Sequence, residues 1–418
     1  MRGSLRLVSV GSVLAAMLAV SIAPASAASP ATRWVDDDGH AGPGGCGGSA
    51  HAATTIQAAV TASHAHDTVM VCPGTYTEQI SIHGSRDGLT LRSSKPFAAV
   101  IRAPASLSSL GIHALVLVDR VDGVTVRGFR VVAPMTAPCD DVDAALVALG
   151  SRGIAFRGNR ISAPGAGDTA DCQMGVGIGI TDRLGDSGPA HAANGVIANN
   201  EVRDAVFAAI IAVGQVKSVN VDVVQNSVRA YFGDPPAGGS SVADGVGGEF
   251  GILYVGHTRG AIRSNVVQGS TSAPLSGAAF LAAIGVANEF GSSGPSNVNG
   301  PIDIRDNLVR RVVYGVYLIQ SHHVTVRHNQ VGNTAFGLIL EGAQYNTLKG
   351  NTIKAKASGI YLDSATIGNV VRSNSVSGVG GTCIDVSPGS GTAGTGNTWT
   401  GNTATVSSSP VGICAVAP

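Results

Sequence analysis

The amino-acid sequence predicts an all-β protein that folds as a right-handed single-stranded parallel β-helix (a solenoid) with a short N-terminal capping helix. The main observation is a repeated motif: an aliphatic or aromatic residue, two further residues, Asn, one residue and usually an aliphatic residue. It occurs as IRDNLV, VRHNQV, LKGNTI and VRSNSV, with asparagines 22 or 23 residues apart at Asn307, Asn329, Asn351 and Asn374. A second element, GVYLI, GLILE and GIYLD, begins eight residues after three of these asparagines. Both elements alternate apolar and variable residues, as half-buried strands do. Short strands at such even spacing fit stacked coils, in which each strand pairs in parallel with its copy one coil away.

Further asparagines mark the same position elsewhere in the chain. They are Asn159, Asn200, Asn226, Asn265 and Asn402, and VRGFRV is a related copy with Phe129 in the asparagine position. Buried amides that lie one above another at a turn can hydrogen-bond along the stack and satisfy the turn backbone. We therefore interpret the asparagines as architecture. The upstream copies are separated by up to 42 residues, so the register is harder to predict there.

The chain is expected to have three segments. Residues 1–27 have the pattern of a signal peptide, because a basic start precedes an apolar run and Ala25-Ser26-Ala27 fits a cleavage site. A membrane anchor is the alternative, but the run is too short for a stable span. Residues 28–66 are predicted to form an N-terminal cap, in which the helical pattern TTIQAAV covers the open end of the first coil. The β-helix is predicted over residues 67–418, with long loops at about 162–193, 229–248 and 287–300.

Six cysteines remain after the first segment: Cys46, Cys72, Cys139, Cys172, Cys383 and Cys414. An even number in an exported chain predicts disulfides, and proximity in sequence suggests the pairs 46–72, 139–172 and 383–414. Metal binding is the alternative, but no CxxC or Cys/His spacing supports it. We therefore expect a secreted, extracellular protein.

The charge of the chain argues against some partners. The formal net charge is zero and only 13% of the residues are charged, so no overall field attracts nucleic acid or a membrane surface. No segment after residue 27 is long and apolar enough to span a membrane. We expect a monomer that neither binds nucleic acid nor crosses a membrane.

The stretch TTIQAAV…DTVMVCPGTYTEQISI…GLTLRS resembles the opening of pectin-lyase-like β-helix proteins. That superfamily includes pectate lyases, pectin methylesterases, polygalacturonases, and alginate and chondroitin lyases. The resemblance covers nearly all of the chain after the signal peptide and implies the fold. It implies no catalytic residue, because the chain contains no WIDH, GxxDFIFG, NTD/GHG or DPHE signature. Function must therefore be argued from individual sites.

Acidic and other polar residues follow the second strand of several coils. Glu341 and Asp363 are 22 positions apart and should lie on adjacent coils, roughly 5 Å from one another. Asp182, His257 and Glu289 follow earlier copies of the strand, and the long loops are expected to wall a groove on the same side. Two neighbouring carboxylates could serve as an acid and a base or bind a cation. These five residues are our candidate catalytic residues, and ordinary solvated turn residues are the alternative interpretation.

Basic residues recur two positions before the repeated Asn. The column contains Arg127, Arg157, Arg263, Arg305, Arg327, Lys349 and Arg372, and Asp303 and Asp306 flank Arg305. Such a column needs either acidic neighbours or an anionic ligand, because like charges repel one another. We assign Arg305, Arg327, Lys349 and Arg372 to substrate binding, together with Tyr317 and Tyr361, which could stack on sugar rings. A solvated outer face is the alternative.

An acidic cluster, Asp140, Asp141 and Asp143, follows Cys139. Carboxylates and carbonyls are the ligands that Ca²⁺ prefers, so Ca²⁺ is the one cofactor that the sequence suggests. A solvated loop is the alternative.

The sequence thus favours a secreted protein that acts on an extracellular, anionic polysaccharide as a lyase or a glycoside hydrolase. The alternative is a glycan-binding or surface-associated β-helix without catalytic activity.

Overall fold

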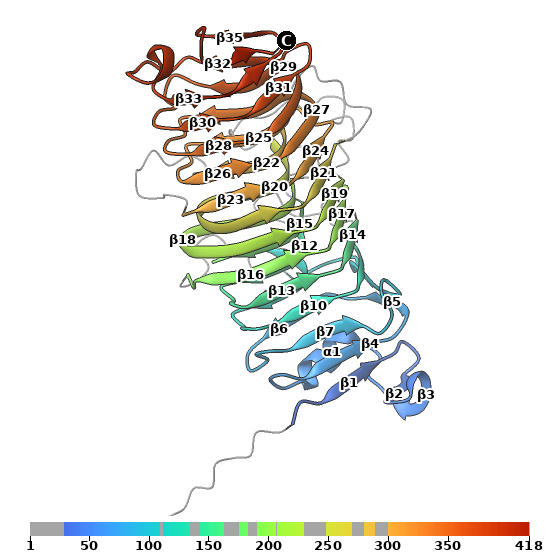
Figure 1. Cartoon of the computed structure of the whole chain (residues 1–418). Coiled ribbons are helices and arrows are strands. Elements are labelled where there is room, and N and C mark those ends of the chain that lie inside the picture. Colours follow the sequence, from blue (N-terminus) through green and yellow to red (C-terminus); the bar gives the residue numbers. More distant parts are fainter. Residues whose placement is uncertain are drawn as a thin grey trace, which may run out of the picture.

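The computed structural model describes residues 29–108, 112–133, 143–162, 175–182, 190–205, 207–229, 248–269, 280–288 and 300–417. These residues form an elongated stack of coils, with the N-terminal strands at one end and the C-terminal strands, including β35, at the other (Figure 1). Nearly all strands pair in parallel with a strand of the next coil, so the predicted right-handed parallel β-helix is confirmed. Each coil contributes to three faces, which we name A, B and C.

Face A carries the strand before the repeated Asn. Its strands are β1 (Thr32–Val35), β4 (Thr68–Val71), β7 (Thr90–Ser93), β10 (Thr125–Arg127), β13 (Ile154–Arg157), β16 (Ala193–Ala198), the second halves of β18 (Ala208–Val224) and β20 (Gly248–Arg263), β23 (Ile302–Arg305), β26 (Val324–Arg327), β28 (Thr347–Lys349), β30 (Val370–Arg372) and β33 (Thr398–Thr400).

Face B carries the strand after the Asn. Its strands are β5 (Gly74–Thr77), β8 (Ala99–Arg102), β11 (Arg130–Val132), β14 (Arg160–Ser162), β17 (Glu201–Arg203), β19 (Ser227–Arg229), β21 (Val266–Gln268), β24 (Leu308–Arg310), the first parts of β27 (Gln330–Glu341) and β29 (Thr352–Leu362), β31 (Ser375–Ser377), β34 (Thr403–Ala404) and β36 (Ala415–Val416).

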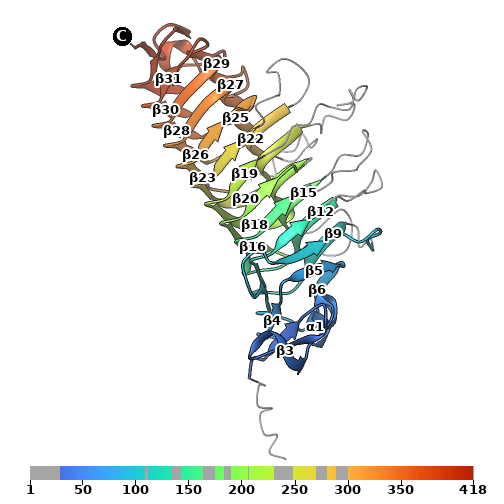
Figure 2. The same cartoon turned by 90° about the vertical axis from the view of Figure 1, so that its right-hand side faces the viewer.

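Face C carries the second predicted strand and is turned toward the viewer in Figure 2. Its strands are β6 (Ile80–His83), β9 (His113–Asp119), β12 (Asp143–Leu149), β15 (Val176–Thr181), the first halves of β18 and β20, β22 (Phe280–Ala287), β25 (Tyr314–Ile319), the second parts of β27 and β29, β32 (Thr382–Asp385) and β35 (Ser407–Ser409). CIDVS aligns with GIYLD after a shift of one residue, as predicted, because Cys383 pairs with Ile360.

The interior is filled by side chains that lie one above another along each face. On face A, Leu91, Val126 and Phe156 occupy the same position in three adjacent coils, and none is exposed to solvent. Burying an aliphatic or aromatic side chain contributes roughly 1.5–3 kcal/mol, so each added coil contributes its own share of core.

The asparagines form a continuous hydrogen-bonded ladder from Asn159 to Asn402, which confirms their structural role. Asn329 shows the pattern: its backbone N–H and its Nδ2 donate to Oδ1 of Asn351, at 3.0 Å each. The same Nδ2 also donates to the carbonyl of Ile304 at 2.9 Å. Phe129 takes the first position, where its backbone N–H donates to Oδ1 of Asn159. The ladder keeps its register across the long coils, where the sequence left the register harder to predict.

A backbone corner precedes each ladder asparagine. The residue just before the Asn, or before Phe129, has a positive φ in every described coil from 128 to 401; these residues are Gly128, Gly158, Asn199, Gln225, Ser264, Asp306, His328, Gly350, Ser373 and Gly401. One residue in the left-handed conformation turns the chain from face A to face B. Glycine adopts this conformation without steric cost, whereas other residues adopt it at about 1 kcal/mol.

A second ladder, which the sequence analysis missed, lies at the corner between faces C and A. Asn346 donates to Oδ1 of Asn369, which donates in the same way to Oδ1 of Asn397. At its end, Asn397 donates to the buried carboxylate of Asp385, which also accepts from the indole of Trp399. This ladder therefore holds the last coils together.

The N-terminal cap contains the predicted helix. Helix α1 (Ile56–Ala62) begins after Thr55, whose side chain accepts from the backbone N–H of Ala58. Strand β1, within the segment 28–66, pairs in parallel with β4, and the boundary at residue 67 stays a prediction. Two antiparallel strands, β2 (His40–Gly42) and β3 (Gly45–His51), complete this end.

Two of the predicted disulfides are present. Cys46 is bonded to Cys72 near the N-terminal end, and Cys383 is bonded to Cys414 near the C-terminal end. Cys139 and Cys172 lie outside the described residues, so their pairing stays a prediction. Disulfides are typical of proteins in oxidising compartments.

Within the described ranges, no helix is long and apolar enough to cross a bilayer.

Candidate functional site

The outer surface of face C is largely apolar. Its central outward column includes Leu117, Val147, Ile211, Leu253 and Ile339. Leu253 is 0% exposed and Ile339 is 3% exposed, although both side chains lie on the outer side of the sheet. We expected a polar groove along this face. The described part of the face instead has a second apolar cluster over most of its length, because most of the residues that point outward there are aliphatic.

The apolar column becomes aromatic toward the C-terminal end. Tyr314 and Tyr317 on β25, Phe336 on β27 and Tyr361 on β29 form what we call the aromatic patch. The ring of Tyr314 stacks on Tyr317, with centroids 5.3 Å apart, and on Phe336, with centroids 5.2 Å apart. Tyr317 is buried, whereas Tyr314, Phe336 and Tyr361 are half-buried and present part of their surface to solvent.

Glu341 lies at the edge of the aromatic patch. It ends β27 and is half-buried, and the phenol of Tyr317 donates a hydrogen bond of 2.5 Å to its Oε2. Burial, and next the contact with Glu341, raise the pKa of Tyr317 far above its ordinary value, so this phenol stays protonated. Burial and the same carboxylate also raise the pKa of Tyr314. Tyr317 thus fixes the orientation of Glu341, in an arrangement that combines aromatic rings with a hydrogen-bond acceptor.

Asp363 lies one coil further along and has a different environment. Its Oδ1 accepts from the backbone N–H of Gly342 at 3.0 Å, from that of Ala365 at 3.1 Å and from the hydroxyl of Thr366 at 2.6 Å. The two carboxylates do lie on adjacent coils, as predicted. The Asp363 side chain, however, accepts hydrogen bonds from its own turn and from the turn that directly follows Glu341.

The other catalytic candidates lie far from this pair. Asp182 is 2% exposed and accepts hydrogen bonds from the backbone N–H groups of Gln215, Val216 and Lys217. The register places it five coils from Glu341, about 24 Å along the axis. Asp182 is therefore positioned to satisfy a turn.

His257 is half-buried and lies three coils from Glu341, about 14 Å along the axis. Glu289 lies outside the described residues. The candidates whose positions are described therefore do not form one catalytic site. Glu341 and Asp363 are the two that the fold brings together.

The predicted basic column exists, but two of its assigned members are neutralised. Nε and Nη2 of Arg327 each donate to a carboxylate oxygen of Asp303, at 2.9 Å in both cases. Arg305 pairs with Asp303 at 2.8 Å and with Asp306 at 3.0 Å. Within residues 300–417, Lys349 and Arg372 form no ion pair. Of the two explanations for the column, acidic neighbours therefore account for Arg305 and Arg327.

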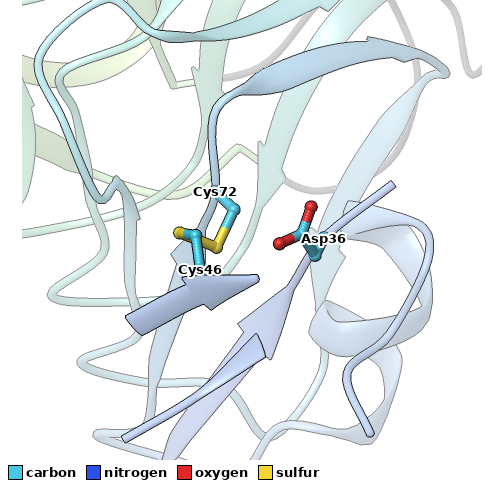
Figure 3. Close-up of side chains that lie close together, drawn as sticks. All are labelled: Asp36, Cys46 and Cys72. Atoms are coloured by element: carbon cyan, nitrogen blue, oxygen red, sulfur yellow. A yellow bond between two sulfur atoms is a disulfide. The ribbon is translucent and has the colours of Figure 1, made fainter. Parts of the chain in front are cut away.

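The metal candidates are only partly described. Asp140 and Asp141 lie outside the described residues, and Asp143 begins β12 opposite His113, so the Ca²⁺ site stays a prediction. Elsewhere in the described residues, Asp36, Cys46 and Cys72 lie close enough together to share an ion (Figure 3). Because both sulfurs of this group form a disulfide, neither is a thiolate that could bind a metal.

Comparison with known proteins identifies one sequence family and several solved structures that share the fold. Residues 286–415 match the family described as periplasmic copper-binding protein (NosD), which is less than half of the chain. No curated protein matches.

Copper prefers His, Cys and Met ligands. The matched segment contains no Met, and its described part brings no three His, Cys, Asp or Glu ligand atoms together. The residues described there do not fit a copper site.

Solved structures share the fold at low sequence identity. The crystal structure of Dettilon tailspike protein superposes with a TM-score of 0.58 and 14% identity, over 84% of this chain and 63% of the tailspike chain. The chain thus spans less than two thirds of the tailspike's length. The A-module of the mannuronan C-5 epimerase AlgE4 from Azotobacter vinelandii gives a TM-score of 0.49 and 15% identity, over 83% of this chain and 91% of that one.

At this identity the likeness to the tailspike shows the fold alone. It agrees with the parallel register and the asparagine ladder, which make the chain a right-handed parallel β-helix protein.

Proposed function

We propose that this protein is exported and binds a polysaccharide on the outer surface of face C, through the aromatic patch and Glu341. The observation that carries the proposal is the combination of half-buried stacked rings with a carboxylate held in place by Tyr317. Ligand sites commonly combine an apolar, aromatic lining with a few fixed polar groups. Two disulfides support export to an oxidising compartment.

The chemistry of the patch selects among sugars. The apolar face of a pyranose ring can pack on Phe336 or Tyr361, and a sugar hydroxyl can donate to the second oxygen of Glu341. Glu341 and Asp363 make this end of the face acidic, which disfavours carboxylated or sulfated sugars in contact with it. The patch is therefore suited to neutral sugar units.

Binding is tested with the purified full chain and a panel of neutral glucans, pectate, alginate and chondroitin sulfate. We expect the variant Phe336→Ala/Tyr361→Ala to lose at least about tenfold in affinity, since interface aromatics are frequent hot spots. Tyr345→Ala is the matched control, because Tyr345 is 58% exposed and lies at the corner outside the patch. An unchanged affinity in the double variant, or an equal loss in the control, would contradict the proposal.

A hydrolase or a lyase activity is the second candidate, and one observation favours it; of the two, a hydrolase fits a patch suited to neutral sugar units, because β-elimination requires a uronate. Glu341 is half-buried, oriented by Tyr317 and one coil from a second carboxylate. A base or an acid at such a place could act on a sugar bound to the patch. Incubation with the same panel, read as absorbance at about 235 nm and new reducing ends, distinguishes the two. Turnover that Glu341→Gln abolishes would establish the enzyme, whereas binding without products supports the binding protein.

A further inference from the structure

Three arginines lie in register near the N-terminal end of face A. Arg92 on β7, Arg127 on β10 and Arg157 on β13 occupy the same outward position in three adjacent coils. Neighbouring coils are about 4.8 Å apart, so three permanently charged guanidinium groups share a strip about 10 Å long. We call these residues the lower arginine column.

The column is not neutralised by the residues that the structure describes. None of the three forms an ion pair there, and Asp122, at the other end of β10, is paired with Arg152. The neighbouring outward positions on the same strands are Thr90, Thr125 and Ala155, and the corners that follow β10 and β13 are Gly128 and Gly158.

The upper part of the same column provides an internal comparison. There, Arg305 and Arg327 have Asp303 at the neighbouring outward position, and Asp306 occupies the corner. The fold therefore neutralises stacked arginines with acidic residues at these two positions, and the lower arginine column has none of them. Like charges directly opposite one another destabilise a sheet unless something lies between them.

Arg92 adds an independent observation. Its Nε is buried and has no hydrogen-bond partner. A buried N–H without an acceptor is costly, and a charged donor more so. An anionic group placed against the column would separate the positive charges.

The surroundings of the column indicate a linear ligand. Arg130, on β11, is exposed and forms no ion pair with any described residue. On the next coil, Arg160 bonds to Glu201 at 2.7 Å and lies over the ring of Phe97. Below Arg92 the column continues with Met70 and then Trp34, both half-buried. Positive charge and an aromatic residue thus follow one another along the helix axis.

We propose that the lower arginine column binds an acidic polysaccharide that runs parallel to the helix axis, through its carboxylate or sulfate groups. Guanidinium groups bind such groups through paired hydrogen bonds. The site lies on face A and does not depend on the aromatic patch of face C, so either proposal can fail without the other. Nucleic acid carries a similar charge, and the test separates it from the glycan.

The test uses the full chain with polygalacturonate, dextran sulfate, uncharged dextran and a single-stranded oligonucleotide, at two salt concentrations. The variant is Arg92→Gln/Arg127→Gln/Arg157→Gln. The control, Arg120→Gln/Arg152→Gln/Arg203→Gln, removes the same charge from arginines that are paired with acids. We expect the wild type to bind the acidic polysaccharides and not dextran, and the variant to lose at least about tenfold in affinity and most of the salt dependence. The control should change affinity by less than about threefold.

An equal loss in variant and control would show diffuse charge attraction and overturn the proposal. So would tighter binding of the oligonucleotide than of either polysaccharide, or no binding of any polyanion. The melting temperature of the variant should equal or exceed that of the wild type, because the exchange to Gln removes repulsion; a clear decrease would mean that the arginines are structural and would also contradict the proposal.

Discussion

At the scale of the residue, the buried side-chain amides of the ladder supply hydrogen bonds at a corner, where strands do not pair. From Asn200 onward, each Oδ1 accepts two hydrogen bonds from the preceding asparagine, and each Nδ2 donates to a backbone carbonyl, as Asn329 shows. Removing one amide therefore leaves several buried polar groups without a partner, which explains why no other residue replaces Asn between Asn159 and Asn402.

We predict that Asn329→Ala lowers the free energy of unfolding by roughly 3–5 kcal/mol, because it leaves the Ile304 carbonyl and the donors of Asn307 unsatisfied. Chemical denaturation measures the change. Asn220→Ala, at an exposed position of β18, should cost less than about 0.5 kcal/mol. Equal effects at the two sites would contradict the role given to the ladder.

The corner residues give a second prediction at this scale. Gly158 has a φ of 59° and open space where a Cβ would be, so Gly158→Ala should cost about 1 kcal/mol from backbone conformation alone. Ser373 has a φ of 53°, and Ser373→Gly should be neutral or stabilising, since glycine accepts this conformation. Thermal unfolding checks that the melting temperature falls in Gly158→Ala and does not fall in Ser373→Gly. A stabilising alanine at position 158 would refute the left-handed corner.

At the scale of the element, one buried carboxylate joins the first strand to the turn that follows helix α1. Asp67 is 3% exposed and accepts from the backbone of Ala31 at 2.7 Å, from that of His64 at 3.0 Å and from Arg33 at 3.1 Å. Burial alone would favour the protonated form, but these hydrogen bonds and the charge of Arg33 lower the pKa of Asp67 below its ordinary value. Asp67, just before β4, thus links Arg33 of β1 and the turn after α1 through a single side chain.

The lowered pKa gives a pH dependence with a definite sign. The stabilisation by Asp67 is present above its unfolded pKa of about 3.9 and is lost as the pH falls through the lower folded value. The difference in melting temperature between wild type and Asp67→Asn should therefore be large at pH 5–7 and shrink below about pH 4. Asp119→Asn, which removes an exposed pair with Arg120, should have little effect at any pH. A difference between wild type and Asp67→Asn that grows toward low pH would contradict this assignment.

At the scale of the whole molecule, the sequence predicts the fold well and the site only in part. The 22-residue repeat is sufficient to place Asn329 over Asn351, because equal spacing leaves one register for stacked coils. The second ladder was missed because Asn346, Asn369 and Asn397 are 23 and 28 residues apart and have no constant flanking pattern. Predicting it would have required knowing that these three asparagines lie at the same corner, between faces C and A.

The candidate site was harder to predict because function depends on neighbours across coils. The sequence predicted correctly that Glu341 and Asp363 lie on adjacent coils. It could not show that the carboxylates of Asp363 and Asp182 accept hydrogen bonds from the backbone of turns. It also did not pair Tyr314 with Phe336, whose stacking needs the register of β25 against β27. The position of the basic column was predicted correctly. Which of its arginines are available to a ligand depends on the acidic residues beside them.

The central claim is that a polysaccharide lies on the aromatic patch, and side-chain footprinting tests it most directly. The full chain is exposed to hydroxyl radicals with and without the polysaccharide of the panel that binds most tightly, and oxidation is measured residue by residue. We predict protection of Phe336 and Tyr361, with Tyr345 unchanged as the exposed reference at the corner. Saturating ligand that leaves Phe336 and Tyr361 as reactive as in the free protein would contradict the claim.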